Sequence, residues 1–540
     1  MSTRGAGFGP SPDMTHRMRS LDVRFHSELE SARSAPECFE RVGPYTNRDG
    51  DKNMRQTGFV RPGCVAAVFT LFVATAGCSR HPQNEPAVQR AANSQPAIPD
   101  TPAGRTFSAW LTSFNSGDAA QISAFKERYK RKGAVENVLS WREAVGGYEL
   151  LRMEESQADS LAALLKEGGS DRAARFQLTR SGDGTGDNLI MEIRTVSLPP
   201  EFAVPRMKLE DALASLTARA DQYAMQDRFS GALLVARNGE ILLQKGWDYA
   251  NRESKQPVTL DTQFRLGSMN KMFTAVATLQ LVESGKLSLS GTVGRYLPDY
   301  PNQDVASKVT VRHLLTHTGG TGDIFGPEFD ANRTMLRGHA DYVKLFGKRG
   351  VEFEPGKEDA YSNYGYVLLG ALIEKVSGMS YYEYVRRRIY DVAGMKLTDS
   401  LPESDSVPGR AAGYMRQHRE WVSNMDTLPY RGMGAGGGYS TVADLFRFAE
   451  ALKAGRLISA KMLAEATSPQ DNGKTYGYGF GVQGEGPMRS YGHGGGAPGM
   501  NGELRIFPQS GYVLVGLSNL DPLAAENMIE HVAVRLPVGE

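Results

Sequence analysis

Cysteine is scarce in this chain of 540 residues. The sequence has only three cysteines, Cys38, Cys64 and Cys78, and all of them lie in the first 78 positions. The remainder of the chain therefore has no internal disulfide, no thiolate metal site and no cysteine nucleophile. Chemistry there must use Ser, Tyr, Lys, His or carboxylate side chains.

Net charge is also nearly absent. The 62 Lys and Arg residues almost balance the 61 Asp and Glu residues, which leaves a formal charge of +1. Binding to nucleic acid or to an anionic membrane by bulk electrostatics needs a concentrated basic surface. We therefore expect no nucleic-acid partner, and the length allows two or three domains.

The apolar run at residues 64–76 is short, with only 13 residues. As a helix it would span about 20 Å, less than the ~30 Å of a hydrocarbon core, but its length is typical of a secretory signal. Arg55 and Arg61 precede the run, and Thr75-Ala76-Gly77 leads into Cys78. This segment resembles the lipobox of bacterial lipoproteins, with Thr where that family prefers Leu.

The lipobox resemblance implies that residues 54–77 are a signal peptide and that Cys78 is the lipidated first residue of the mature protein. The protein would then be anchored in the bacterial cell envelope and face the periplasm, or be secreted to the periplasm if Cys78 is not lipidated. A buried helix in a short N-terminal domain is the alternative. Residues 1–53 show no sustained apolar periodicity, so we expect disorder there. Because a signal peptide should lie at the N-terminus, we also expect that translation starts at Met54 and that residues 1–53 are an over-extended gene start. Residues 78–103, rich in Pro, Gln, Asn and Ala, predict a flexible tether.

Residues 104–199 predict a small α+β domain. Phe107, Trp110, Leu111 and Phe114 follow helical spacing, a second helix is expected near 135–145, and four strand-like segments follow at 148–155, 161–166, 174–180 and 189–198. The segment 114–118 (FNSGD) gives this region a resemblance to nuclear-transport-factor-2-like domains. Ser123 and Lys126 form a Ser-x-x-Lys spacing, but their many basic neighbours indicate a solvated helix face. We expect a structural or substrate-presenting role for the domain.

Ser268 and Lys271 form a second Ser-x-x-Lys pair, in the region 205–535. The pair precedes a segment with helical apolar spacing, so both side chains should lie on one face within hydrogen-bond reach. We expect Ser268 in the first turn of this helix, where the positive helix end would favour a serine alkoxide, and a lysine with a lowered pKa could take or relay its proton.

Tyr361-Ser362-Asn363 is the next group of interest. A tyrosine beside a lysine ammonium can ionise below its usual pKa of ~10 and act as a general base, and Asn363 could orient Lys271 and a substrate carbonyl. The same spacing recurs at 45–47 and 300–302, so the motif has little weight alone.

A glycine-rich segment with one histidine, His493-Gly494-Gly495-Gly496, follows near the C-terminus. Glycines at a strand edge let a ligand approach the backbone, and their N–H groups can form an oxyanion hole. Two runs that predict a hairpin, 502–507 and 512–518, come next.

Together, and in this order, the three motifs resemble the serine β-lactamase and penicillin-binding-protein superfamily, on the side of class C β-lactamases, DD-peptidases and family VIII esterases. The segments 287–301, 311–320 and 436–452 strengthen the resemblance. It implies an α/β (α+β) transpeptidase-like domain, with an antiparallel sheet and a helical subdomain. It also implies that Ser268 is acylated and that Lys271 and Tyr361 act as general acid and base. By the same resemblance, substrate is bound or oriented by Asn363, His493, Gly494 and Gly495. The oxyanion hole is expected to be formed by the N–H groups of Ser268 and Gly496.

The sequence departs from the β-lactamase pattern at His493 and Gly494, where that family carries Lys or His followed by Thr. A fixed cation that would attract a substrate carboxylate is lost or becomes pH-dependent, and the hydroxyl that would hydrogen-bond that carboxylate is lost. We therefore expect a serine hydrolase for an ester, amide or D-amino-acid peptide bond, with a small-molecule or peptide substrate and no cofactor. The alternatives are a DD-carboxypeptidase or endopeptidase of peptidoglycan peptides, a β-lactamase, and a catalytically weak binding or regulatory protein. The oligomeric state is left open. His313 and His317 have a zinc-compatible spacing, but we expect packing at a helix end and no metal.

Overall fold

The computed structural model describes residues 96–539, except 197, 418–419, 472 and 474. Residues 1–53, the predicted signal peptide, Cys78 and most of the predicted tether lie outside the described residues. Within the described range, no helix combines the length and the apolar character needed to cross a membrane.

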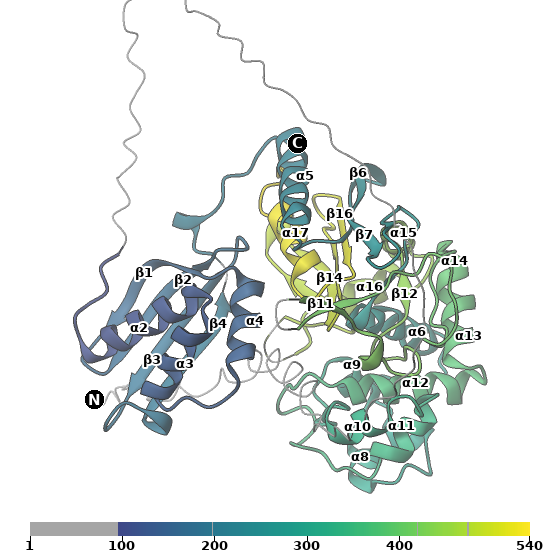
Figure 1. Ribbon diagram of the computed structural model, residues 1–540. Helices are drawn as coiled ribbons and strands as arrows, with labels where there is room; N and C mark the ends of the chain where they lie inside the picture. The colour runs from purple at the N-terminus through teal and green to yellow at the C-terminus, as the bar shows by residue number, and fades with distance from the viewer. Residues whose placement is uncertain (1–95, 197, 418–419, 472, 474, 540) are drawn as a thin grey trace, which may run out of the picture. The chain divides into compact units, whose positions relative to one another are not determined.

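The first described part of the chain packs three helices on a four-stranded antiparallel meander, with strand order β1-β2-β3-β4 (Figure 1). Its elements are α2 (Pro102–Ser116), α3 (Ala119–Arg128), α4 (Val135–Val145), β1 (Tyr148–Ser156), β2 (Ser160–Glu167), β3 (Ala173–Arg180) and β4 (Leu189–Val196). Phe107, Trp110 and Phe114 are buried, and the rings of Trp110 and Phe176 lie 4.5 Å apart. The apolar spacing of α2 thus forms the core of this part.

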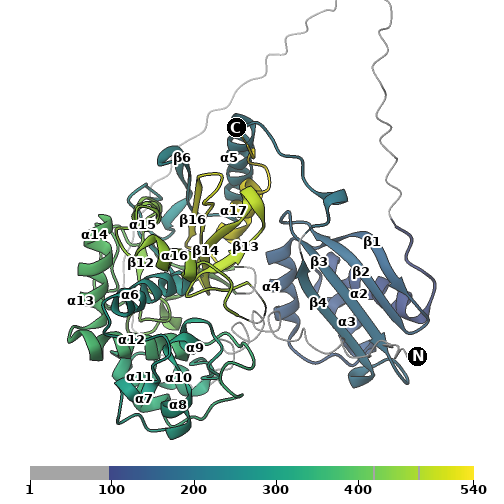
Figure 2. The same cartoon turned by 180° about the vertical axis from the view of Figure 1, so that it is seen from behind.

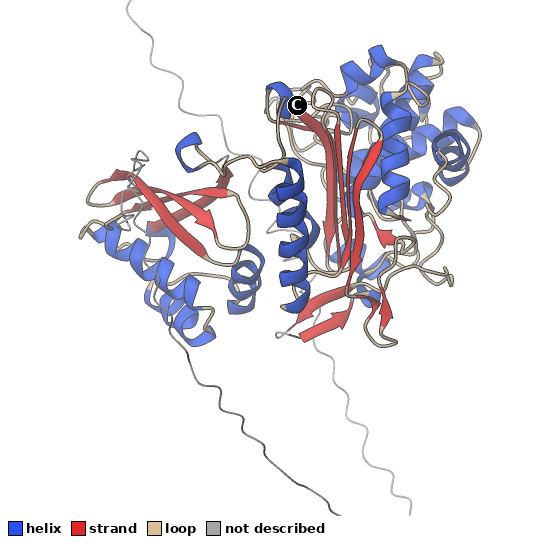
Figure 3. Ribbon diagram, turned by 90° about the horizontal axis from the view of Figure 1, so that it is seen from above, coloured by secondary structure: helices blue, strands red, loops and turns tan. Residues whose placement is uncertain are grey.

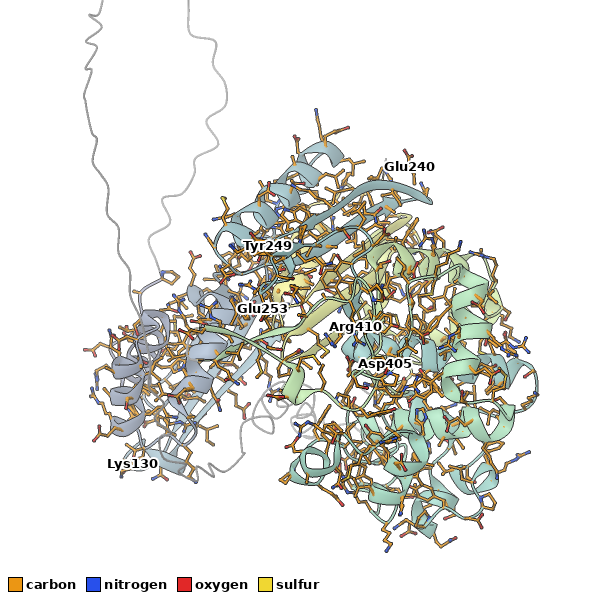
Figure 4. All side chains as sticks on the ribbon, turned by 45° about the vertical axis from the view of Figure 1, so that its right-hand side comes forward. Lys130, Glu240, Tyr249, Glu253, Asp405 and Arg410 are labelled. Atoms are coloured by element: carbon orange, nitrogen blue, oxygen red, sulfur yellow. The ribbon has the colours of Figure 1, made fainter. Side chains whose placement is uncertain are left out.

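The first Ser-x-x-Lys spacing of the chain, Ser123 and Lys126, lies on α3 in this same part. Ser123 is exposed, and Lys126 Nζ donates to the carbonyl oxygen of Lys132 at 2.6 Å. Lys130, labelled in Figure 4, lies just beyond the end of this helix. This helix face is solvated, as its charges indicate.

The second part is built on a six-stranded antiparallel sheet of order β13-β14-β15-β16-β5-β6. Its strands are β5 (Gly231–Arg237), β6 (Glu240–Trp247), β13 (Gly481–Gln483), β14 (Ser490–Ala497), β15 (Met500–Ile506) and β16 (Tyr512–Ser518). Asn238 and Gly239 join β5 to β6 with φ of 51° and 87°, as a type I′ turn requires, and Glu240 marks this hairpin in Figure 4. The hairpin at 230–246 and the C-terminal strands thus form one sheet.

Helices cover both faces of this sheet, as Figures 2 and 3 show. On one face, α5 (Leu209–Met225) and α17 (Ala524–Ala533) pack over Leu233, Val235 and Leu514. On the other face lies α6 (Lys271–Glu283), which is buried over most of its length, together with α12 (Asn363–Ser377).

A mainly helical region surrounds α6 and α12. Its further helices are α7 (Val293–Tyr296), α8 (Gln303–Lys308), α9 (Val311–Leu315), α10 (Pro327–Asn332), α11 (His339–Phe346), α13 (Tyr381–Val385), α14 (Asp391–Ala393), α15 (Val442–Lys453) and α16 (Ala460–Ala466). Short strands connect them: β7 (Tyr249–Asn251), β8 (Gln256–Pro257), β9 (Phe264–Arg265), β10 (Tyr414–Gln417), β11 (Glu420–Ser423) and β12 (Tyr439–Ser440). An antiparallel sheet with a helical subdomain, preceded by a small α+β part, is the fold class that the sequence predicts.

Candidate active site

Ser268 lies in a tight turn directly before α6. The turn is the 3₁₀ segment η3 (Gly267–Asn270), which starts with Gly267 at φ +52°, a conformation that favours glycine. Ser268 thus precedes the α-helix. The expectation that it lies in the first turn of that helix is wrong. Its contact with Lys271 is kept because side chains three residues apart eclipse each other in a 3₁₀ turn.

This turn is held from two sides. Strand β9 pairs with β12, and Arg265 of β9 forms a buried ion pair with Glu403 at 2.8 Å. Arg410 donates to the carbonyl oxygens of Glu403 and Asp405; Arg410 and Asp405 are labelled in Figure 4. The backbone N–H of Gly437 donates to the carbonyl of Gly267 at 3.1 Å, so a glycine-rich loop closes around the turn.

Lys271 is the first residue of α6, and its side chain is completely buried. Its Nζ donates to Ser268 Oγ at 3.2 Å, to Asn363 Oδ1 at 2.7 Å and to the carbonyl oxygen of Ala435 at 2.6 Å. An ammonium group has three N–H donors, so these three acceptors match its protonated form. Ser268 itself is only half-buried, which leaves its hydroxyl within reach of a ligand.

The Tyr361-Ser362-Asn363 segment meets this lysine at the start of α12. Ser362 caps the helix, and its Oγ accepts from the N–H of Gly365 at 2.9 Å. Lys271 Nζ lies 4.6 Å from the ring centre of Tyr361 and 5.5 Å from that of Tyr366. The structure therefore brings Ser268, Lys271, Tyr361 and Asn363 together from segments almost a hundred residues apart.

Strand β14 supplies the opposite wall with His493 and the glycines that follow it. A Cβ on Gly495 would lie 2.0 Å from the carbonyl oxygen of Leu266, and a Cβ on Gly267 would lie 3.1 Å from the nitrogen of Gly496. The end of the strand thus packs directly on the turn that carries Ser268. Only residues without side chains allow this approach of two backbones.

The protonation of His493 is fixed by its two hydrogen bonds. Nδ1 faces the carbonyl oxygen of Gly494, which can only accept, so Nδ1 carries the proton. Nε2 then accepts from the hydroxyl of Tyr476 at 2.9 Å. Burial, assisted by the charge of Lys271, lowers the pKa of His493 to about 4, so this histidine is neutral at physiological pH.

The other tyrosines near the site also stay neutral. Burial raises the pKa of Tyr366 and of Tyr476 above the usual value of a phenol. Tyr366 donates to the carbonyl oxygen of Leu315 at 2.9 Å. Both residues act as fixed hydrogen-bond donors around Lys271 and His493.

His313 and His317 do not share one helix, because α9 ends at Leu315 and His317 has a positive φ of 59°. His313 Nδ1 accepts from the N–H of Thr310, and His317 Nδ1 accepts from the N–H of Ser362 at 3.0 Å. The His317 ring stacks on Tyr361 with centroids 4.3 Å apart. Among the residues that the structure describes, no three His, Cys, Asp or Glu side chains are grouped to hold a metal.

Sequence reasoning missed several residues of this site. The Ala435 carbonyl, Tyr476 and Asp323 contact the predicted residues from distant loops, and Asp323 does so through Asn363 Nδ2. The glycines on both sides of Ala435 were a signal, because a glycine run often marks a close backbone approach. Tyr476 and Asp323 carried no comparable signal.

Comparisons with known proteins agree with this geometry. The family described as Beta-lactamase matches residues 212–537. Penicillin-binding protein 4* of Bacillus subtilis (strain 168) is 34% identical over 314 residues, which are 54% of this chain and 68% of that protein. Esterase EstB of Burkholderia gladioli is 34% identical over 216 residues, which are 36% of this chain and 55% of the esterase.

A solved structure shows the same fold. The penicillin-binding protein from Bacillus halodurans aligns with a TM-score of 0.53 and 30% identity, over 57% of this chain and 97% of that one. Since the family match spans more than half of the 540 residues, the chain belongs to the β-lactamase family. It is a serine hydrolase of the penicillin-binding-protein and esterase type.

The close packing of β14 on the Ser268 turn yields a first prediction. Gly495→Ala should lower the thermal unfolding midpoint by several degrees, because the added methyl meets backbone at 2.0 Å and overpacking costs about 1–3 kcal/mol. Gly494→Ala is the matched control, since its Cβ would meet Glu526 Oε1 at an ordinary 3.4 Å. Circular dichroism melts compare the two variants, and equal midpoints would contradict the prediction.

Proposed function

We propose that this protein hydrolyses an ester, amide or D-amino-acid peptide bond through an acyl-enzyme formed on Ser268. The contact that carries the proposal is the 3.2 Å hydrogen bond from Lys271 Nζ to Ser268 Oγ, inside a buried cluster that also holds Asn363 and Tyr361. Ser268 and Tyr361 are partly exposed, whereas Lys271 and Asn363 are buried.

The protonated form of Lys271 determines how the proton moves. An ammonium that donates to Ser268 Oγ cannot accept the serine proton at the same time. Its charge, 4.6 Å from the ring centre of Tyr361, instead favours the phenolate form of that tyrosine. Tyr361 is then the base that takes the proton from Ser268, and Lys271 stabilises both oxygens.

The reaction has two halves. Ser268 Oγ attacks the substrate carbonyl, and the N–H groups of Ser268 and Gly496 bind the resulting oxyanion. The proton held by Tyr361 passes to the leaving alcohol or amine as the bond to the carbonyl carbon breaks. Water then attacks the acyl carbon and gives its proton to Tyr361. Tyr361 passes this proton to Ser268 Oγ as the bond from Oγ to the acyl carbon breaks, which releases the acid and restores Ser268.

The substrate class follows from the charge at His493. A neutral imidazole at this position, next to Gly494 without a hydroxyl, offers no cation and no side-chain donor from residue 494 to a substrate carboxylate. This arrangement favours esters, amides and D-amino-acid peptides over penicillins. The similarity to an esterase, EstB, is in line with an ester substrate.

Peptidoglycan peptides are the second candidate, cleaved by a DD-carboxypeptidase or endopeptidase activity. Similarity to penicillin-binding proteins over more than half of the chain favours it. A p-nitrophenyl ester series, a chromogenic cephalosporin and D-alanyl peptides, tested on one preparation, rank these activities. A binding protein without turnover is the outcome if none of them is consumed.

Serine labelling tests the proposed nucleophile. A fluorophosphonate probe should label the wild-type protein, and Ser268→Ala should abolish labelling because the probe is attached through Ser268 Oγ. Ser123→Ala, in the other Ser-x-x-Lys spacing, is the matched control and should label at the wild-type rate. Labelling that persists in Ser268→Ala would refute the assignment.

Exchange of the neutral imidazole for a cation tests the substrate class. His493→Lys should raise the ratio of cephalosporin to ester kcat/KM by about tenfold, because a charge-assisted hydrogen bond to a carboxylate contributes about 1.5–3 kcal/mol. His493→Gln keeps the position neutral and should leave the ratio near its wild-type value. A wild-type protein that already turns over cephalosporins efficiently would contradict the premise.

We also propose that Cys78 carries a lipid anchor, as its lipobox-like context predicts. Expressed from Met54 in a bacterium with lipoprotein processing, the wild-type protein should incorporate labelled palmitate and sediment with membranes. Cys78→Ser should lose both properties, whereas Cys64→Ser, within the predicted signal, should keep them. Equal labelling of wild type and Cys78→Ser would exclude this anchor.

A further inference from the structure

Asp323 contacts the active-site cluster from the loop between α9 and α10. Both of its carboxylate oxygens lie 3.1 Å from Asn363 Nδ2, while Asn363 Oδ1 accepts from Lys271 Nζ at 2.7 Å. The side chains thus form a chain of ammonium, amide and carboxylate. Asn363 is only 3% exposed, so the amide between the two charges is shielded from water.

The carboxylate decides which way the Asn363 amide points. With the amide reversed, its NH₂ group would face the Lys271 ammonium and its oxygen would face the Asp323 carboxylate. Both contacts would be repulsive, in a site where little water screens them. Without the carboxylate, an asparagine can place either end toward a neighbour, and only one end accepts from Lys271.

The carboxylate also adds negative charge close to a buried cation. Three of the acceptors of Lys271 Nζ, the Ser268 hydroxyl, the Asn363 amide oxygen and the Ala435 carbonyl oxygen, are neutral groups. A buried cation is costly unless an anion compensates it. Asp323 lies directly behind one of these acceptors and polarises it, which strengthens the hydrogen bond to the ammonium.

Asp323 is itself firmly held. Its Oδ1 accepts from the N–H of Ile324 at 2.6 Å, and its carbonyl oxygen accepts from Arg349 at 2.8 Å. The preceding residue, Gly322, accepts from Ser362 Oγ at 2.5 Å, and Ser362 is the cap of the helix that begins with Asn363. The loop and the start of α12 therefore keep a fixed spacing.

We propose that Asp323 is a positioning residue for Lys271: it holds the Asn363 amide with its oxygen toward the ammonium and supplies the compensating negative charge. This inference rests on the proposed function, because it concerns the lysine that serves Ser268. Asp323 acts through Asn363 and does not touch the reacting atoms.

The test is the rate of fluorophosphonate labelling, which reports acylation of Ser268 without deacylation. Asp323→Asn keeps an acceptor for Ile324 but removes the charge, and it should lower the maximal labelling rate about 10- to 100-fold. The probe concentration that gives half of this rate should change little. Asp304→Asn, which removes an exposed carboxylate paired with Lys308 on α8, should match the wild type.

A double-mutant cycle separates action through Asn363 from a general structural effect. In an Asn363→Ala background, Asp323→Asn should cost less than about threefold, because the amide that it orients is gone. Asn363→Ser serves instead if Asn363→Ala does not fold, as judged by circular dichroism.

These measurements distinguish failure of the role of Asp323 from failure of the proposed function. Wild-type labelling by Asp323→Asn, or fully multiplicative losses in the double variant, would overturn the role of Asp323 alone. A wild-type protein that is not labelled at all, or labelling that survives Ser268→Ala, would overturn the proposed function itself.

Discussion

The buried ammonium of Lys271 is the constraint on which the rest of this site depends. Removal of a cation from water is expensive, and it is tolerated only where every N–H finds an acceptor. The acceptors come from the turn before α6, from the first residue of α12 and from the Ala435 loop. Because no single segment can satisfy the lysine, the helices and the loop must be packed together before the site exists.

Glycine makes this convergence sterically feasible. Gly495 brings β14 onto the Leu266 carbonyl, and the glycines around Ala435 let its loop close over the Ser268 turn. A side chain at these positions would separate the backbones by more than a hydrogen bond spans. The abundance of glycine near the site therefore reflects backbone contacts, and it brings the backbone nitrogen of Gly496 close to Gly267.

Charge is distributed unevenly across the site. The cation of Lys271 is turned inward toward neutral acceptors with Asp323 behind them, whereas His493 on the opposite wall is held neutral by burial and by that same cation. His493 is therefore neutral because burial and the nearby Lys271 charge both lower its pKa. Residue 493 therefore adds no cation to the site.

The sequence by itself determined the fold class, the family and the order of the motifs. Apolar periodicity, the Asn238-Gly239 turn and each of the motifs at Ser268, Tyr361 and His493 can be recognised within a short stretch of sequence. It could not reveal Asp323, Tyr476 or the Ala435 carbonyl, since their contacts join loops far apart in the chain. It also placed Ser268 in an α-helix, because the positive φ of Gly267 is a property of the packed turn. Only the tertiary structure decided the protonation of His493 and the orientation of Asn363, because both depend on burial and on neighbours that the chain order does not encode.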